Sequence, residues 1–215
     1  MGLRFFRPVT LFHPDGDLEF SSYLNGRIAS VSFAPLPQTA AWRHHTARAG
    51  FEVAYFRPPR VEGCTTAVED GRTWVVDYVI DLDAGWVTRR ARVTSRSVAG
   101  ARCTLLESDG ARSWVVDGTP AAHLDGCFDV DLEASAMTNT FPVHRLGLAA
   151  GAGSAAPAAY VRALDLAVER LDQPYARVTE GGYDYVAPVF GVACRLAYDE
   201  HGLLLDYPGL ATRKA

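Results

Sequence analysis

The 215-residue chain contains a single lysine, no long apolar run and no block of basic residues. Lys214 is that lysine, so arginine supplies almost all of the positive charge. The formal net charge is −4 at pH 7. A general nucleic-acid binder needs clustered cations that can follow a phosphate backbone, so this class is excluded.

Membrane-spanning and secretion signals are also missing. No apolar stretch approaches the roughly 20 residues that a transmembrane helix needs. The opening residues, MGLRFFRPVTLFHPDGD, are too polar and too interrupted by proline for the core of a signal peptide. We therefore expect a cytoplasmic protein without a transmembrane segment.

Patterns that carry chemistry are absent as well. The chain has no GxSxG, HExxH, GxGxxG or P-loop sequence. The adjacent His44 and His45 would point to opposite faces of a strand, which is poor geometry for one metal. Four cysteines are scattered without a CxxC pair: Cys64, Cys103, Cys127 and Cys194. We expect buried thiols, no metal, no cofactor and no enzymatic activity.

The first part of the chain differs from the rest. Residues 1–37 contain four prolines and only one short alternating run, at 28–33. They predict a partly ordered N-terminal extension, followed by one β domain over 38–215. At this length and with 48% hydrophobic residues, a single large β domain can bury a core of ordinary size.

Short strand-like runs recur along the β domain with turn residues between them. The expected strands cover 51–56, 64–69, 73–82, 86–95, 102–107, 112–116, 175–180, 183–186, 192–198 and 203–207. The segment 160–171 fits either an amphipathic helix or two short strands. Such a pattern predicts a mostly β protein built as a sandwich, a barrel or one curled sheet.

One polar patch, residues 123–146, interrupts the apolar pattern. Asp129 and Asp131 are two residues apart in a strand-like segment, so they share a face. We favour a hydrogen-bonding role for this pair; a polar-ligand contact, a metal site and an acid–base pair are alternatives. Thr138, Asn139 and Thr140 suit either a pinned loop or contacts to sugar hydroxyls, with neither preferred.

Arg145 and the aromatic residues each allow two interpretations. Arg145 either pairs with Asp129 or Asp131, which we favour, or binds an anion. Its neighbour His144 is expected to be a partly exposed imidazole. Most aromatic residues belong in the core, and a minority are candidates for lining an apolar cavity: Trp42, Trp74, Tyr78, Trp86, Tyr185 and Tyr207.

Several of these segments occur together, in order, over most of the chain. They begin with Trp42 and Gly50-Phe51-Glu52 and end with Leu205-Asp206-Tyr207-Pro208-Gly209-Leu210. The most specific are Leu124-Asp125-Gly126-Cys127, Asp129-Val130-Asp131-Leu132 and Thr138-Asn139-Thr140-Phe141-Pro142. In this pattern the chain resembles the bacterial putative glycolipid-binding family. The resemblance implies a fold similar to periplasmic lipoprotein carriers: a large antiparallel sheet curled into an open half-barrel, with few short helices.

The resemblance also implies a function. We expect non-enzymatic binding of a lipid or glycolipid in an apolar cavity on the concave side of the sheet, walled mainly by strands 73–82 and 86–95. The polar patch is then expected near the cavity mouth or against one wall. One alternative is a structural or partner-binding β domain with a packed core. A less favoured one is an acid–base enzyme on a sugar-like substrate that uses Asp129 or Asp131.

Overall fold

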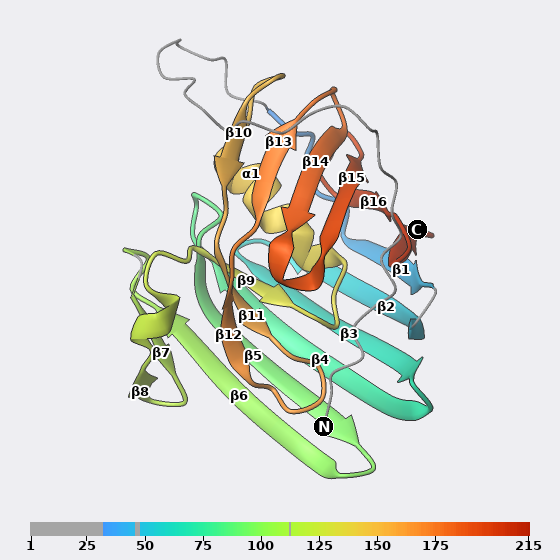
Figure 1. Cartoon of the computed structure of the whole chain (residues 1–215), viewed down its shortest axis with the longest axis vertical. Helices are drawn as coiled ribbons and strands as arrows, with labels where there is room; N and C mark the ends of the chain where they lie inside the picture. Colours follow the sequence, from blue (N-terminus) through green and yellow to red (C-terminus); the bar gives the residue numbers. More distant parts are fainter. Residues whose placement is uncertain (1–31, 46–47, 112) are drawn as a thin grey trace.

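The computed structural model describes residues 32–45, 48–111 and 113–215. In these residues, one antiparallel sheet of fourteen strands curls around part of its own chain (Figure 1). The sheet order runs β10-β13-β14-β15-β16-β17-β1-β2-β3-β4-β5-β6-β7-β8, so β10 and β8 are free edges and the sheet is not closed. The expected mostly β fold, an open curled antiparallel sheet, is confirmed.

Two runs of strands make up this sheet. The first run contains β1 (Thr39–His44), β2 (Arg48–Arg57), β3 (Arg60–Glu69), β4 (Arg72–Leu82), β5 (Thr88–Ser97), β6 (Gly100–Ser108), β7 (Trp114–Val116) and β8 (Thr119–Pro120). The second contains β10 (Gly153–Ala155), β13 (Pro174–Arg177), β14 (Gly182–Ala187), β15 (Val192–Tyr198), β16 (Leu204–Tyr207) and β17 (Ala211–Arg213). The last strand, β17, pairs with the first, β1, and joins the two runs.

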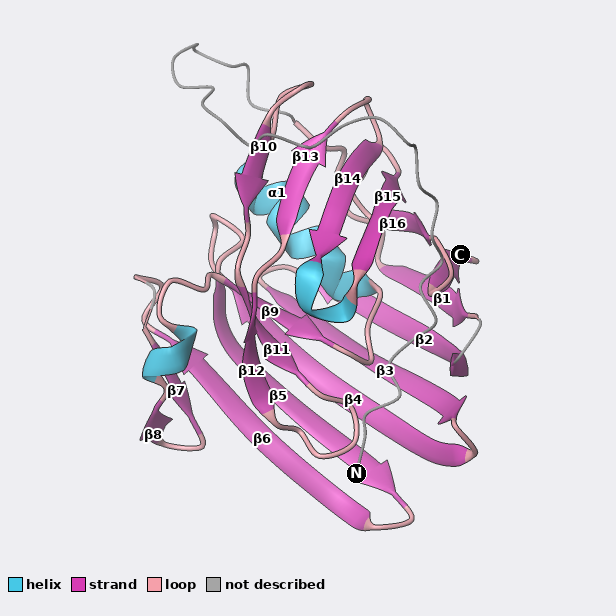
Figure 2. Cartoon of the chain, in the orientation of Figure 1, coloured by secondary structure: helices cyan, strands magenta, loops and turns pink. Residues whose placement is uncertain are grey.

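A second sheet and one α-helix lie inside the curl. The second sheet has the order β12-β11-β9, with β12 at Val168–Leu171, β11 at Ala158–Val161 and β9 at Asp129–Leu132. The helix α1 (Thr140–Leu146) follows the 3-10 turn η2 (Met137–Asn139), and two further 3-10 turns are η1 (Ala122–Leu124) and η3 (Pro188–Phe190). Figure 2 shows α1 and β9 enclosed between the two runs of the large sheet.

Side-chain alternation gives the long strands two distinct faces. In β4, Trp74, Val76, Tyr78 and Ile80 are all buried, whereas the residues between them are partly exposed. The buried side chains share one core with apolar residues of the 130–143 segment. We call this side of β1–β6 the inner face and the opposite side the outer face.

The structure contradicts some of the expectations from the sequence and adds elements that were not expected. The segment 160–171 forms parts of two short strands, β11 and β12, so the helix alternative is wrong. The helix α1 and the strand β1 were not expected. Residues 1–31, with most of the 28–33 run, lie outside the described residues. In the described part of the chain, no helix is long and apolar enough to cross a membrane.

Candidate functional site

Asp129 and Arg145 form the centre of the polar patch. Arg145 on α1 donates two hydrogen bonds to Asp129 on β9: Nε to Oδ1 at 2.9 Å and an N–H of the guanidinium to Oδ2 at 2.6 Å. The guanidinium also lies 5.0 Å from the ring centre of Phe128. Burial raises the pKa of Asp129, and Arg145 opposes that rise. The favoured internal pairing is therefore what the structure shows, and both groups are committed to each other.

Asp131 is held differently. It is 7% exposed and accepts a 2.8 Å hydrogen bond from the Thr138 hydroxyl. Burial raises its pKa to about 6; the Thr138 bond lowers the value and the nearby Asp129 raises it. Without a cationic partner of its own, Asp131 is the carboxyl of the patch that gains a proton most easily.

The Thr138-Asn139-Thr140 triplet belongs to the part of the chain inside the curl, residues 129–146, which we call the inner segment. Its hydrogen bonds attach the inner segment to the second run of strands. Asn139 Oδ1 accepts a 2.9 Å bond from the Tyr175 hydroxyl, and its backbone oxygen accepts one of 3.1 Å from Tyr198. Asn139 is 4% exposed and Thr140 is fully buried. The Thr140 hydroxyl has no hydrogen-bond partner among the described residues.

A third buried carboxylate, Glu52 on β2, was not among the candidate residues. Glu52 is fully buried and accepts hydrogen bonds from the Tyr78 hydroxyl at 2.7 Å, from the Ala136 amide at 2.7 Å and from the Ser135 hydroxyl. The Nε2 atom of His44 lies 3.8 Å from Oε2 of Glu52. Burial and the adjacent Glu52 raise the pKa of Tyr78 well above its ordinary value. This network ties β2 and β4 to the chain inside the curl.

Gly63 makes the link between Tyr78 and Glu52 possible. Tyr78 is on β4 and Glu52 on β2, so the tyrosine must reach across β3, where Gly63 is its direct neighbour. A Cβ atom at position 63 would lie 2.2 Å from the Tyr78 Oη and Cζ atoms. A glycine in the middle of a strand is therefore explained by the ring that passes over it.

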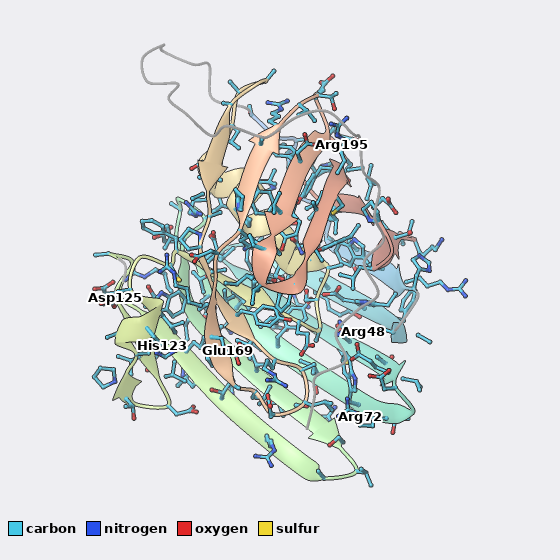
Figure 3. The ribbon with its side chains drawn as sticks, viewed as in Figure 1. Arg48, Arg72, His123, Asp125, Glu169 and Arg195 are labelled. Atoms are coloured by element: carbon cyan, nitrogen blue, oxygen red, sulfur yellow. The ribbon has the colours of Figure 1, made fainter. Side chains whose placement is uncertain are left out.

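Arg48 forms a third buried polar contact at the end of β2 (Figure 3). Its guanidinium contacts the Glu69 carboxylate at 3.2 Å, lies 5.0 Å from the ring centre of Trp74 and donates to the backbone oxygen of Glu133. Arg48 is 1% exposed, and its Nε has no hydrogen-bond partner in the described residues. The contact to Glu133 fixes the start of the inner segment against the sheet.

The six aromatic candidates are mostly part of the packed core. Trp42, Trp74, Tyr78 and Tyr185 are buried, and Tyr207 packs against the core while partly exposed. Trp86 is stacked on His144 with ring centres 3.7 Å apart. Burial lowers the pKa of His144 to about 4, so this stack contains a neutral imidazole at pH 7. Only Trp74 borders the hollow described next.

A hollow of about 540 Å³ lies on the outer face, where it crosses β2 to β5. One wall is a cross-strand row of Phe51, Thr66, Val75 and Arg96. The other wall is formed by Ala49, Val68 and Thr73. Between the walls, the inward-pointing residues Gly50, Ala67 and Trp74 leave strand backbone as the floor. We call this hollow the outer trough; the polar patch is on the other side of the sheet.

One group of possible metal ligands is present in the described residues: Asp199, Glu200 and His201, whose ligand atoms lie within 4.8 Å of one another. The Asp199 carboxylate already accepts hydrogen bonds from the amides of His201 and Leu203, both at 2.9 Å, and pairs with Arg213. These bonds account for its position in the turn between β15 and β16.

Comparisons with known proteins identify one matching family and one similar solved structure. A family profile described as "Putative glycolipid-binding" matches residues 39–213. A crystal structure of a DUF1089 family protein from Pseudomonas aeruginosa is similar with a TM-score of 0.73 and 31% sequence identity. That match covers 90% of this chain and 100% of the other. No curated protein matches the chain.

The Glu52 network predicts a large effect for a small change at position 63. Gly63→Ala should push the Tyr78 ring away from Glu52 and lower the free energy of unfolding by about 2–4 kcal/mol, from overpacking and a lost buried hydrogen bond. Gly85→Ala is the matched control, because its Cβ would meet only Asp83 Oδ1 at 3.4 Å. Urea unfolding measures both. Equal stability of the two variants would contradict the role given to Gly63.

The raised pKa of Asp131 predicts a pH-dependent stability. Its folded-state pKa of about 6 exceeds the ordinary value of 3.8, so the folded protein holds an extra proton between these values. The stabilisation is complete below about pH 4 and is lost as the pH rises through about 6. Asp131→Asn removes this titration, so from pH 4 to pH 7 its stability should improve relative to the parent by roughly 2–3 kcal/mol. A difference that does not change with pH, in urea unfolding, would refute the assignment.

Metal removal should leave the protein unchanged. Since hydrogen bonds and Arg213 satisfy Asp199, we expect EDTA not to shift the melting temperature, whereas a structural metal adds its binding energy to folding. Differential scanning fluorimetry with and without chelator is sufficient. A clear drop that one divalent ion reverses would show that a metal stabilises the fold.

Proposed function

This chain belongs to the family described as "Putative glycolipid-binding", whose profile it matches, and on that basis we propose that it binds a lipid or glycolipid without transforming it. We further propose that the acyl part of the ligand lies in the outer trough. The observation that carries the proposal is the trough itself: an apolar-walled hollow of about 540 Å³. Small-molecule sites usually range from about 300 to 1,000 Å³.

The shape of the trough suits a chain-like ligand. It crosses four strands, so its length is about 14 Å, or three interstrand spacings. Phe51 and Val68 line opposite walls and are 42% and 47% exposed, so a bound chain would remove apolar surface of the protein from water. Each buried CH2 group contributes about 0.8 kcal/mol. Arg96 lines the trough at its β5 end and pairs with Asp77 at 2.7 Å, which leaves its other N–H groups as donors for a polar head group.

The concave side is the less favoured location for the ligand. The carboxylates and the amide of the polar patch are already bonded within the protein: Asp129 with Arg145, Asp131 with Thr138, and Asn139 with Tyr175. A ligand would have to replace these bonds with equally good ones, because unpaired buried polar groups cost about 1–3 kcal/mol each.

A second candidate function rests on Asp131. A carboxyl with a pKa of about 6 is suited to proton transfer near neutral pH, which favours the acid–base alternative. Asp131 is nevertheless 7% exposed and bonded to Thr138, so substrate access requires opening the core. Turnover of a sugar-like substrate that Asp131→Asn abolishes would favour this second function over simple binding.

Titration calorimetry with single-chain glycolipids below their micelle concentration tests the proposal. Affinity should rise with chain length until the trough is full, with a negative heat-capacity change. Val68→Asp should weaken binding about tenfold or more, because it places a charge in the apolar wall. Val189→Asp is the matched control, since Val189 is 69% exposed on η3, away from the trough.

The possible results separate the parts of the proposal. Equal loss of affinity in the two variants, or no loss in either, would show that the ligand does not bind in the trough. Absence of binding by every lipid would contradict lipid binding itself and favour a structural or partner-binding β domain.

A further inference from the structure

We propose that the outer face of β1–β6 is a docking surface for an anionic lipid bilayer. The proposal rests on the proposed lipid binding for its purpose, because a trough that opens on this face would receive its ligand directly from the membrane. Its physical basis is separate: the distribution of exposed apolar groups and unpaired cations over the whole face.

Large apolar side chains are exposed on this face. Phe51 and Tyr55 on β2 are 42% and 49% exposed, and Val68 on β3 is 47% exposed. All three alternate with buried residues of the inner face, so they point outward together. Only Phe51 and Val68 line the trough; Tyr55 extends the apolar surface beyond it. Aromatic and aliphatic groups of this kind insert into the boundary between head groups and acyl chains.

The charges on the same face are unbalanced toward positive. Four outward carboxylates each have an arginine partner, and these pairs are Arg57–Glu62, Arg60–Asp81, Arg90–Glu107 and Arg96–Asp77. Arg43 on β1 and Arg92 on β5 are exposed and, among the described residues, have no carboxylate partner. The face therefore has an excess of cations in a chain whose formal net charge is −4.

Each unpaired arginine is next to apolar side chains. Arg43 is the cross-strand neighbour of Phe51. Arg92 is the neighbour of Val79 on β4 and of Leu105 on β6. Their apolar stems can cover these side chains while the guanidinium groups reach a layer of anionic head groups. Adjacent apolar and cationic groups on one face match an anionic bilayer better than a nucleic acid, which offers no apolar layer.

Vesicle co-sedimentation of the full chain tests the surface. Vesicles of phosphatidylcholine with phosphatidylserine should bind the protein, and vesicles of phosphatidylcholine alone should bind it much more weakly. Added salt should reduce the binding, because it screens exposed charges. Arg43→Gln and Arg92→Gln should each weaken binding about fivefold, the usual contribution of one basic residue at an anionic surface. Tyr55→Ser should also weaken it.

A matched control comes from the opposite side of the sheet. Arg102 on β6 is exposed and has no carboxylate partner in the described residues, and it lies two residues before the inner-face residue Thr104, so it points to the same inner face. Arg102→Gln removes the same charge and should leave vesicle binding close to that of the parent. All four variants should keep the melting temperature of the parent, since the altered side chains are exposed.

The outcomes distinguish this proposal from the proposed function. Calorimetric affinity for an uncharged single-chain glycolipid should be unchanged in Arg43→Gln and Arg92→Gln, because neither residue lines the trough. Failure of the protein to bind anionic vesicles, equal binding to neutral vesicles, or an equal effect of Arg102→Gln would overturn the docking surface and leave ligand binding in the trough untouched. Loss of glycolipid binding in the parent would instead contradict the proposed function.

Discussion

A buried carboxylate, Glu52, constrains most of this fold. A polar group inside a protein is tolerated only when hydrogen bonds replace its water, so Glu52 fixes the positions of Tyr78, Ser135 and the Ala136 amide. The Tyr78 side chain can reach Glu52 only because residue 63 is a glycine. Ser135 and Ala136 belong to the segment inside the curl, so the same carboxylate attaches that segment to the sheet. Arg48 attaches the same segment to the sheet at Glu133, and Arg145 joins α1 to β9 within the segment.

The filled interior gives the two faces of the sheet different properties. On the inner face, polar side chains bond one another across elements that are distant in sequence, and the apolar residues between them form one core. On the outer face, apolar side chains of β2 and β3 remain exposed beside arginines. A patch of exposed apolar side chains on one face of a sheet is a recognised sign of an interaction surface. The proposed ligand and membrane contacts both follow from this asymmetry.

Much of the large sheet could be predicted from the sequence, because alternation of apolar and polar residues directly encodes a half-buried strand. The pairing of Asp129 with Arg145 could be predicted because both residues lie in one short polar segment. The role of Glu52 could not be predicted, because a glutamate in a strand is usually solvent-exposed and its partners are 26 to 84 residues away. The available signals were Gly63 within a strand and the Gly50-Phe51-Glu52 motif. The seven-residue α1 is too short to show a helical period, and 160–171 fitted two periods equally.

The central claim is that the ligand contacts the outer face of the sheet and does not contact the inner segment. Photo-crosslinking tests it most directly: a single-chain glycolipid with a diazirine on its acyl chain is bound, irradiated and located by peptide mass spectrometry. We expect labels at the trough walls, on residues 49–51, 66–68 and 73–75. Labels concentrated on β9 and α1, residues 129–146, or on β13–β15, would place the ligand inside the curl and contradict the claim.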